Sequence, residues 1–227
     1  AALTASDGRP APHLFAGTRP LSESEREGLE GLPFEEETFK AQAGMRPGTE
    51  LVGDPEAPVW ARMWRQPAVT VVALEASPLE GSSNQIVDVA RARVSVRIVP
   101  DQDPLQVQDA LVRHFETHLP WGLELSVQRE AVAKWWVTEP IGPAFDAARE
   151  AMQAGYGRKT EIIGCGGTIP FVEPFARVLG GIPAILMGLE DPLCRAHSEN
   201  ESLLVADFER GSRAAVHLYA GLADALR

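Results

Sequence analysis

A strict alternation of apolar and polar residues places the strongest constraint on what this chain can fold into. In the run IVDVARARVSVRIVP (residues 86–100), alternate positions from 90 to 98 are all apolar, and three arginines and a serine stand between them. Successive side chains of a strand point to opposite faces of a sheet, so the pattern predicts a strand with one buried and one polar face. Residues 68–76 and 122–131 are predicted to be strands as well.

The segments around these strands predict helices on one face of a small twisted sheet. Residues 103–119 are expected to form a helix that Asp103 caps, with a proline at its first position. Two shorter helices are expected earlier, the first behind a capping box that begins at Ser22, whereas residues 44–66 resemble a connector. Strand, strand, helix and strand in this order predict an α+β layer for residues 1–133.

The pattern changes near residue 134, where helices begin to alternate with short apolar segments. Helices are predicted at residues 139–155, 168–180 and 201–227, and strands at residues 160–164 and 182–189. Such alternation is typical of the flank of a mostly parallel sheet that helices cover. The sequence therefore predicts a mixture of α+β and α/β architecture in two domains, residues 1–133 and residues 134–227.

Composition excludes several classes of function. The chain has 227 residues, 44% of them hydrophobic, and a net charge of −11, which opposes binding to nucleic acid. No apolar run is long enough to span a membrane. Two cysteines without a C-x-x-C pair exclude a disulfide framework and a cysteine zinc site. With no charged-then-apolar leader, the cytoplasm is the expected compartment. The chain opens without Met on what resembles the tail of a helix, so we expect a longer protein.

Two pairs of side chains are of the residue types that often bind metals or act as nucleophiles. His114 and His118, in the run HFETH, have the spacing of a helical zinc pair. Phe115 stands where a metalloprotease needs glutamate, and no third ligand is apparent, so we interpret the pair as a solvent-facing helix face. Cys165 and Cys194 are interpreted as small packing residues, since no histidine or basic residue adjoins Cys165.

Three further features are candidates for ligand binding. The run GCGGTIPF (residues 164–171) brings glycines to the start of a helix, where it is either a plain tight turn or a site for a carboxylate. Arg97 ends a predicted strand, either as an exposed arginine or as a planar fork for a carboxylate. His197 lies in a loop of acids and amides, GLEDPLCRAHSENES, where an imidazole is either an ordinary loop residue or a metal ligand.

Four stretches together resemble the two-zinc metallopeptidase family of carnosinase, aminoacylase and glutamate carboxypeptidase. They are NQIVDVARARVSVRIVP, VTEPIGPAF, GCGGTIPF and GLEDPLCRAHSENESL, in the order and at spacings similar to those of the family. The resemblance covers nearly the whole chain. It implies that residues 1–133 are most of a lid or dimerisation domain, and that residues 134–227 are the last part of a catalytic α/β domain.

The resemblance also implies a role for five residues. The family's A-H-x-x-N-E loop supplies a zinc-binding histidine, which corresponds to His197. An arginine at the end of a lid strand holds the substrate carboxylate, which corresponds to Arg97. A residue that reaches across a homodimer to the partner's site corresponds to Asn84. A glycine-rich turn that contacts the substrate backbone corresponds to Gly167 and Thr168.

The sequence departs from the family pattern in two ways. Cys165 and Val87 stand where relatives often carry glutamate and proline. The family's other zinc ligands and its general base come from an upstream half, so no catalytic base is expected within this chain. The helices in RPLSESEREGLEGLPFEEETFKAQAG resemble those of the carnosinase-like dipeptidase branch.

The resemblance therefore implies a fragment of a metal-dependent hydrolase that cleaves the amide bond of dipeptides or related small peptides. Two zinc ions, or manganese or cobalt in their place, would serve each full-length active site, and the fragment alone is expected to be inactive. Two alternatives stay open: a deacylase of N-acyl amino acids in the same family, and a non-catalytic dimerisation module.

Overall fold

The computed structural model describes residues 3–6, 8–165 and 169–225. Two compact units divide the chain: one comprises Ala1–Leu29 and Leu51–Trp135, and the other Glu30–Glu50 and Trp136–Arg227. Helices and one small antiparallel sheet make up the structure, so the predicted mixed α/β class is confirmed. Within the described ranges, no helix is long and apolar enough to cross a membrane.

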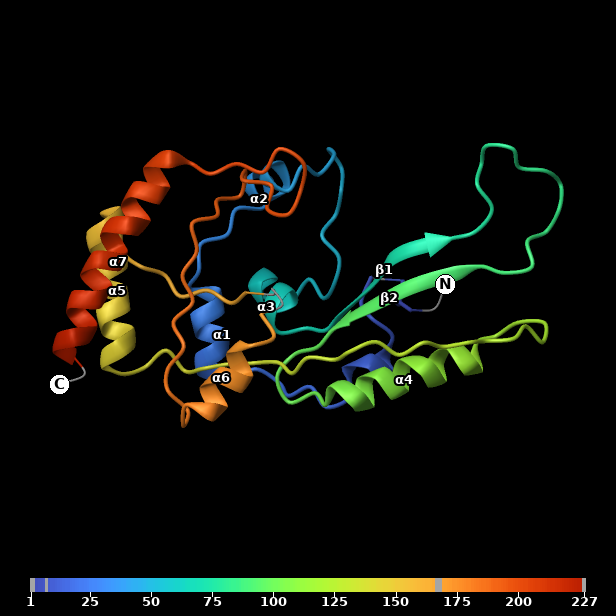
Figure 1. The fold of residues 1–227 in the computed structure, drawn as a ribbon, viewed down its shortest axis with the longest axis horizontal. Helices are drawn as coiled ribbons and strands as arrows, with labels where there is room; N and C mark the ends of the chain where they lie inside the picture. Colours follow the sequence, from blue (N-terminus) through green and yellow to red (C-terminus); the bar gives the residue numbers. More distant parts are fainter. Residues whose placement is uncertain (1–2, 7, 166–168, 226–227) are drawn as a thin grey trace. The chain divides into compact units, whose positions relative to one another are not determined.

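An antiparallel hairpin is the central feature of the first unit. β1 (Ala68–Glu75) pairs with β2 (Arg91–Arg97), and a long loop joins them (Figure 1). Apolar residues meet across the strands, as Val96 and Val69 do, so the predicted strand is confirmed. The predicted buried face is not found, because every residue of β1 and β2 is exposed or half-buried. The pairing of β2 stops at Arg91 and Arg97, well inside the predicted range of residues 86–100.

Short helices precede this hairpin along the chain, and a longer helix follows it. α4 (Pro104–Thr117) begins where the Asp103 carboxylate accepts hydrogen bonds from two backbone N–H groups, at 2.8 and 3.0 Å, which confirms the predicted cap. The short 3-10 helix η1 (Pro12–Phe15) packs against α4. α1 (Glu23–Glu30) begins with the predicted capping box.

One α-helix of this unit was not predicted, and neither was the short 3-10 helix η1. α3 (Val59–Trp64) lies within residues 44–66, which we interpreted as a connector. Its length of 6 residues is too short to display a helical period. The rings of Trp60 and Trp64 stack on each other within this helix, with their centroids 5.0 Å apart.

Three predicted strands are wrong. Residues 122–131, 160–164 and 182–189 form no strand ladder in the described structure. A period of two sets only the directions of side chains, and a strand also needs a neighbouring edge for its hydrogen bonds. Residues 122–131 instead run beside α4, where Gln108 Nε2 donates to the Glu130 carbonyl oxygen over 3.1 Å.

Two long helices form the core of the second unit. α5 (Pro143–Tyr156) and α7 (Val205–Ala225) lie side by side in Figure 1, and most of the buried residues on α5 are alanines. Small residues allow close approach of the two backbones. The shorter helices of this unit are α2 (Glu36–Gln42) and α6 (Val172–Val178).

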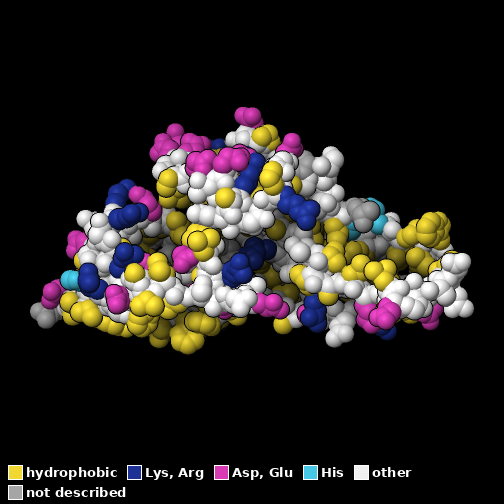
Figure 2. Space-filling model, turned by 90° about the horizontal axis from the view of Figure 1, so that it is seen from above, with side chains coloured by type: hydrophobic (Ala, Val, Ile, Leu, Met, Phe, Trp, Pro, Cys, Tyr) yellow, Lys and Arg dark blue, Asp and Glu magenta, His cyan; other side chains and the backbone are white. Residues whose placement is uncertain are grey.

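Several large apolar side chains of this unit are exposed. Figure 2 shows hydrophobic side chains exposed at the surface of the structure. Phe208 is 51% exposed and Tyr219 is 75% exposed, both on α7.

Gly155→Ala is expected to destabilise the second unit by about 1–3 kcal/mol, the usual cost of overpacking. A Cβ at this position would lie 2.6 Å from the Arg210 carbonyl oxygen and 2.7 Å from the Ala214 Cβ. Gly28→Ala, in the exposed helix α1, is the matched control, because a Cβ there meets nothing within 4 Å. That control should gain up to about 1 kcal/mol from helix propensity. Urea unfolding measures both; equal effects would contradict the assignment of close packing.

Candidate metal- and substrate-binding residues

The loop that carries His197 is closed by backbone hydrogen bonds. The N–H of Ser202 donates to the carbonyl oxygen of Cys194 over 2.9 Å, and the N–H of Cys194 donates to Asp191 over 3.1 Å. Cys194 is 5% exposed, so its interpretation as a packing residue is confirmed. The same interpretation is wrong for Cys165, which is exposed.

His197 itself occupies an unusual backbone conformation. Its φ is 62°, and Arg195 and Asn200 in the same loop have φ values of 54° and 60°. Positive φ is uncommon outside glycine, and such residues often mark functional sites. The N–H of His197 donates to a Glu201 carboxylate oxygen over 3.2 Å, and the residue remains exposed. The loop therefore presents the imidazole at the surface on a fixed backbone.

The described residues do not make a complete metal site. No group of three or more His, Cys, Asp or Glu residues among them could hold a metal ion. A catalytic zinc takes about three protein ligands. One exposed imidazole on a fixed loop fits the role of a single ligand, and the donor set would have to be completed by other residues.

Arg97 differs from the other arginines of β2. Arg91 lies 3.6 Å from a Glu75 carboxylate oxygen, and Arg93 lies 3.0 Å from one of Glu130. Arg97 has no hydrogen-bond or ion-pair partner for its side chain in the part of the chain that the structure describes. It ends β2 opposite Ala68 and is exposed. Its guanidinium is therefore available for an external carboxylate.

A buried glutamine fixes the turn that follows Arg97. Gln102 is 1% exposed, and its side-chain oxygen accepts from the Val99 N–H over 3.1 Å. Its side-chain nitrogen donates to the carbonyl oxygens of Leu14 and Ala16, at 2.8 and 3.1 Å. Sequence reasoning missed Gln102, because an amide gives no sign of partners so distant along the chain.

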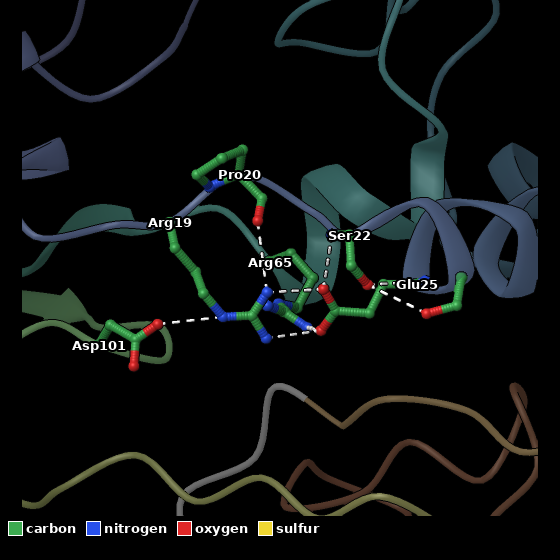
Figure 3. A network of polar contacts seen from close by, with 7 residues as sticks. Arg19, Pro20, Ser22, Glu25, Arg65 and Asp101 are labelled. Carbon is green, nitrogen blue, oxygen red and sulfur yellow. Dashed lines mark hydrogen bonds and ion pairs between the residues drawn. The ribbon is translucent and has the colours of Figure 1, made fainter.

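An ion network ties the same turn to two helices (Figure 3). Arg19 Nε lies 3.0 Å from an Asp101 carboxylate oxygen, and its terminal nitrogens bind Glu25 at 2.7 and 2.8 Å. Arg65, at the end of α3, adds a second contact to Glu25 at 2.5 Å. Hydrogen bonds from Arg19, Ser22 and Arg65 hold the pKa of Glu25 well below its usual range. The network therefore anchors the end of β2 on α1 and α3.

The structure separates Asn84 from Arg97. Asn84 is exposed in the loop between β1 and β2, whereas Arg97 ends β2 at the opposite end of the hairpin. A strand rises about 3.3 Å per residue, so the length of β2 lies between them. The two side chains do not converge on one ligand within this unit.

The remaining candidates belong to the second unit. Gly167 and Thr168 lie outside the described residues, so their predicted contact with substrate stays a prediction. The described helix α6 begins at Val172, after the predicted start at residue 168. His197 also belongs to this unit.

Comparison with known proteins gives consistent matches. Residues 13–220 match the family described as peptidase family M20/M25/M40. A cysteinylglycine-S-conjugate dipeptidase of Corynebacterium striatum is 27% identical over 181 residues, which are 79% of this chain and 40% of that protein. A Cys-Gly metallodipeptidase (DUG1) of Saccharomyces cerevisiae is 27% identical over 199 residues, 86% of this chain and 40% of that protein.

A solved structure has the same fold. The crystal structure of human carnosine dipeptidase 1 superposes with a TM-score of 0.84 at 20% identity, over 98% of this chain and 47% of that one. The chain thus spans about 40% of the length of the two sequence relatives.

Proposed function

Because the chain belongs to peptidase family M20/M25/M40, we propose that it is the C-terminal part of a cytoplasmic, metal-dependent dipeptidase. The observation that carries the proposal is the family match over residues 13–220, with relatives named as dipeptidases. Cleavage of the amide bond of a dipeptide such as Cys-Gly is the proposed reaction. Residues 1–133 would serve as lid and dimerisation domain, and residues 134–227 as the end of the catalytic domain.

Each candidate residue receives a role in this proposal. His197 would supply one metal ligand, and Arg97 would hold the terminal carboxylate of the substrate. Gly167 and Thr168 would contact the substrate backbone. Bound metal ions, with zinc proposed and manganese or cobalt as substitutes, would acidify a water and polarise the scissile carbonyl. The free guanidinium of Arg97 and the fixed loop of His197 support these roles.

A homodimer is part of the same proposal. Asn84 lies at the far end of the hairpin from Arg97, a placement that suits a residue acting in the partner subunit's site. The long exposed loop that carries Asn84 gives it the reach for such a contact.

The experiment compares the 227-residue chain with a full-length protein that contains it. With added zinc or manganese, the full-length protein should hydrolyse Cys-Gly, and the chain alone should give background rates, because one imidazole cannot hold a catalytic zinc. Light scattering on the full-length sample should give a dimer. A full-length protein that is inactive with either metal would contradict the function; turnover by the repurified chain alone would contradict the inactivity.

A further inference from the structure

Three histidine rings stack against one another where η1 packs on α4. The ring centroids of His13 and His114 lie 4.6 Å apart at an interplanar angle of 22°, and those of His114 and His118 lie 4.1 Å apart at 30°. We call these three side chains the histidine stack. The prediction of a solvent-facing helix face is wrong for His114, which is 7% exposed because η1 covers it.

The surroundings of His13 and His114 favour the neutral form of these two rings. Burial lowers the pKa of His13, and the charges of His118 and Arg113 lower it further. Burial also lowers the pKa of His114, with added repulsion from His118 and His13. His13 Nε2 is buried and has no hydrogen-bond partner among the described residues, so a proton there would have no acceptor.

The histidine stack does not have the geometry of a metal site. Nitrogen lone pairs lie in the plane of an imidazole, so rings that stack face to face direct them past one another and not toward one point. Consistent with this, no group of three His, Cys, Asp or Glu residues within the described ranges could hold a metal ion. The histidine stack can therefore respond to pH by gaining or losing protons, but it is not arranged to coordinate a metal ion.

The histidine stack is connected to the end of β2 through η1. Leu14, next to His13, is 0% exposed, and its carbonyl oxygen accepts a hydrogen bond from Gln102. Gln102 also binds the Val99 N–H, within the turn that follows Arg97. Displacement of η1 from α4 would therefore remove partners of Gln102 and loosen that turn.

We propose that the histidine stack is a pH-sensitive latch, which holds η1 on α4 when its rings are neutral and releases η1 when they are protonated. Two charged rings 4 to 5 Å apart in a partly buried site repel each other, and release exposes them to water. The latch acts on the turn after Arg97. Its consequence for substrate binding rests on the proposed function, whereas the latch itself does not.

The sign of the pH dependence follows from the direction of the pKa shifts. When η1 is released, His13 and His114 bind protons with the ordinary histidine pKa of 6.5. When η1 is latched, their pKa is lower, so they bind protons only at lower pH. The latch therefore stabilises the first unit above pH 6.5, and the stabilisation is lost as pH falls below it. Each additional proton taken up on release weakens the closed state by up to about tenfold per pH unit.

The test is an NMR titration of the 227-residue chain from pH 8 to pH 5, without substrate or metal. The Hε1 signals of His13 and His114 should titrate below the ordinary histidine pKa of 6.5. The backbone N–H signals of Val99 and Gln102 should change with the same midpoint as the two rings. Because no activity is measured, the result stands whether or not the chain belongs to a dipeptidase.

Variants separate protonation from simple loss of packing. His13→Phe with His114→Phe keeps two aromatic rings in the stack and removes two titrating groups. The fold-change in the unfolding equilibrium constant between pH 7.5 and pH 5 should be several-fold smaller in this double variant than in the wild type. His217→Phe replaces an exposed residue of α7. It is the matched control and should keep the full pH dependence.

Two results would overturn the proposal. The first is titration of His13 and His114 in the wild type at or above the ordinary histidine pKa of 6.5, a result that does not depend on whether a variant folds. The second is titration of the rings with no change at Val99 and Gln102, which would show that η1 stays in place when the rings are charged.

Discussion

Gln102→Leu is expected to lower the free energy of unfolding of the first unit by about 2–4 kcal/mol. The substitution removes three hydrogen bonds and leaves the Val99 N–H and the carbonyl oxygens of Leu14 and Ala16 without this partner in a buried region. A buried polar group left unsatisfied costs about 1–3 kcal/mol. Leucine has a volume close to that of glutamine, so the loss reports on polar contacts and not on a cavity.

Gln108→Leu is the control for this measurement. Gln108 is a half-buried glutamine on α4 with one side-chain hydrogen bond, from Nε2 to the Glu130 carbonyl oxygen at 3.1 Å. Water can replace that single bond, so the expected loss is below about 1 kcal/mol. Urea unfolding followed by circular dichroism measures both variants. Similar losses for the two glutamines would show that Gln102 does not hold the turn after β2.

Local signals predicted much of this structure. The alternation in residues 86–100 predicted β2 and its apolar face, because a period of two is a property of neighbouring residues. Asp103 and Ser22 predicted two helix starts, because a cap acts within one turn of helix. The resemblance that gives His197 its expected role as a metal ligand also depends on a short stretch of sequence. The hydrogen-bonded surface loop around His197 is compatible with that role.

Long-range contacts account for what the sequence could not predict. Gln102 binds the Leu14 carbonyl oxygen, 88 residues away along the chain, and a single amide letter carries no sign of this. The burial of His114 likewise depends on η1, which lies about a hundred residues earlier in the sequence. The segments at 122–131, 160–164 and 182–189 have apolar patterns that fit strands, but pairing requires a neighbouring edge that their own residues do not specify.

Arg97→Ala, in a full-length enzyme, is expected to lower kcat/KM for free dipeptides by about 2–5 kcal/mol in transition-state stabilisation, the scale for truncating one partner of a buried charge pair. The guanidinium has no partner among the described residues and would bind the terminal carboxylate by charge-assisted hydrogen bonds. Arg97→Lys keeps the charge but loses the planar fork, so it should still weaken turnover. Dipeptides with an amidated C-terminus should lose far less, since their charge is already absent.

Two comparisons make the role of Arg97 specific. Arg93→Ala removes an arginine from the same face of β2, but one that already pairs with Glu130 at 3.0 Å, so it should change kcat/KM by less than about 1 kcal/mol, as exposed ion pairs do. His197→Ala should instead lower the metal content and impair free and amidated substrates alike, because it acts on the metal and not on recognition. Kinetics on both substrates beside metal analysis separate these outcomes. Equal losses on free and amidated dipeptides for Arg97→Ala, or full metal occupancy in His197→Ala, would contradict the assignments.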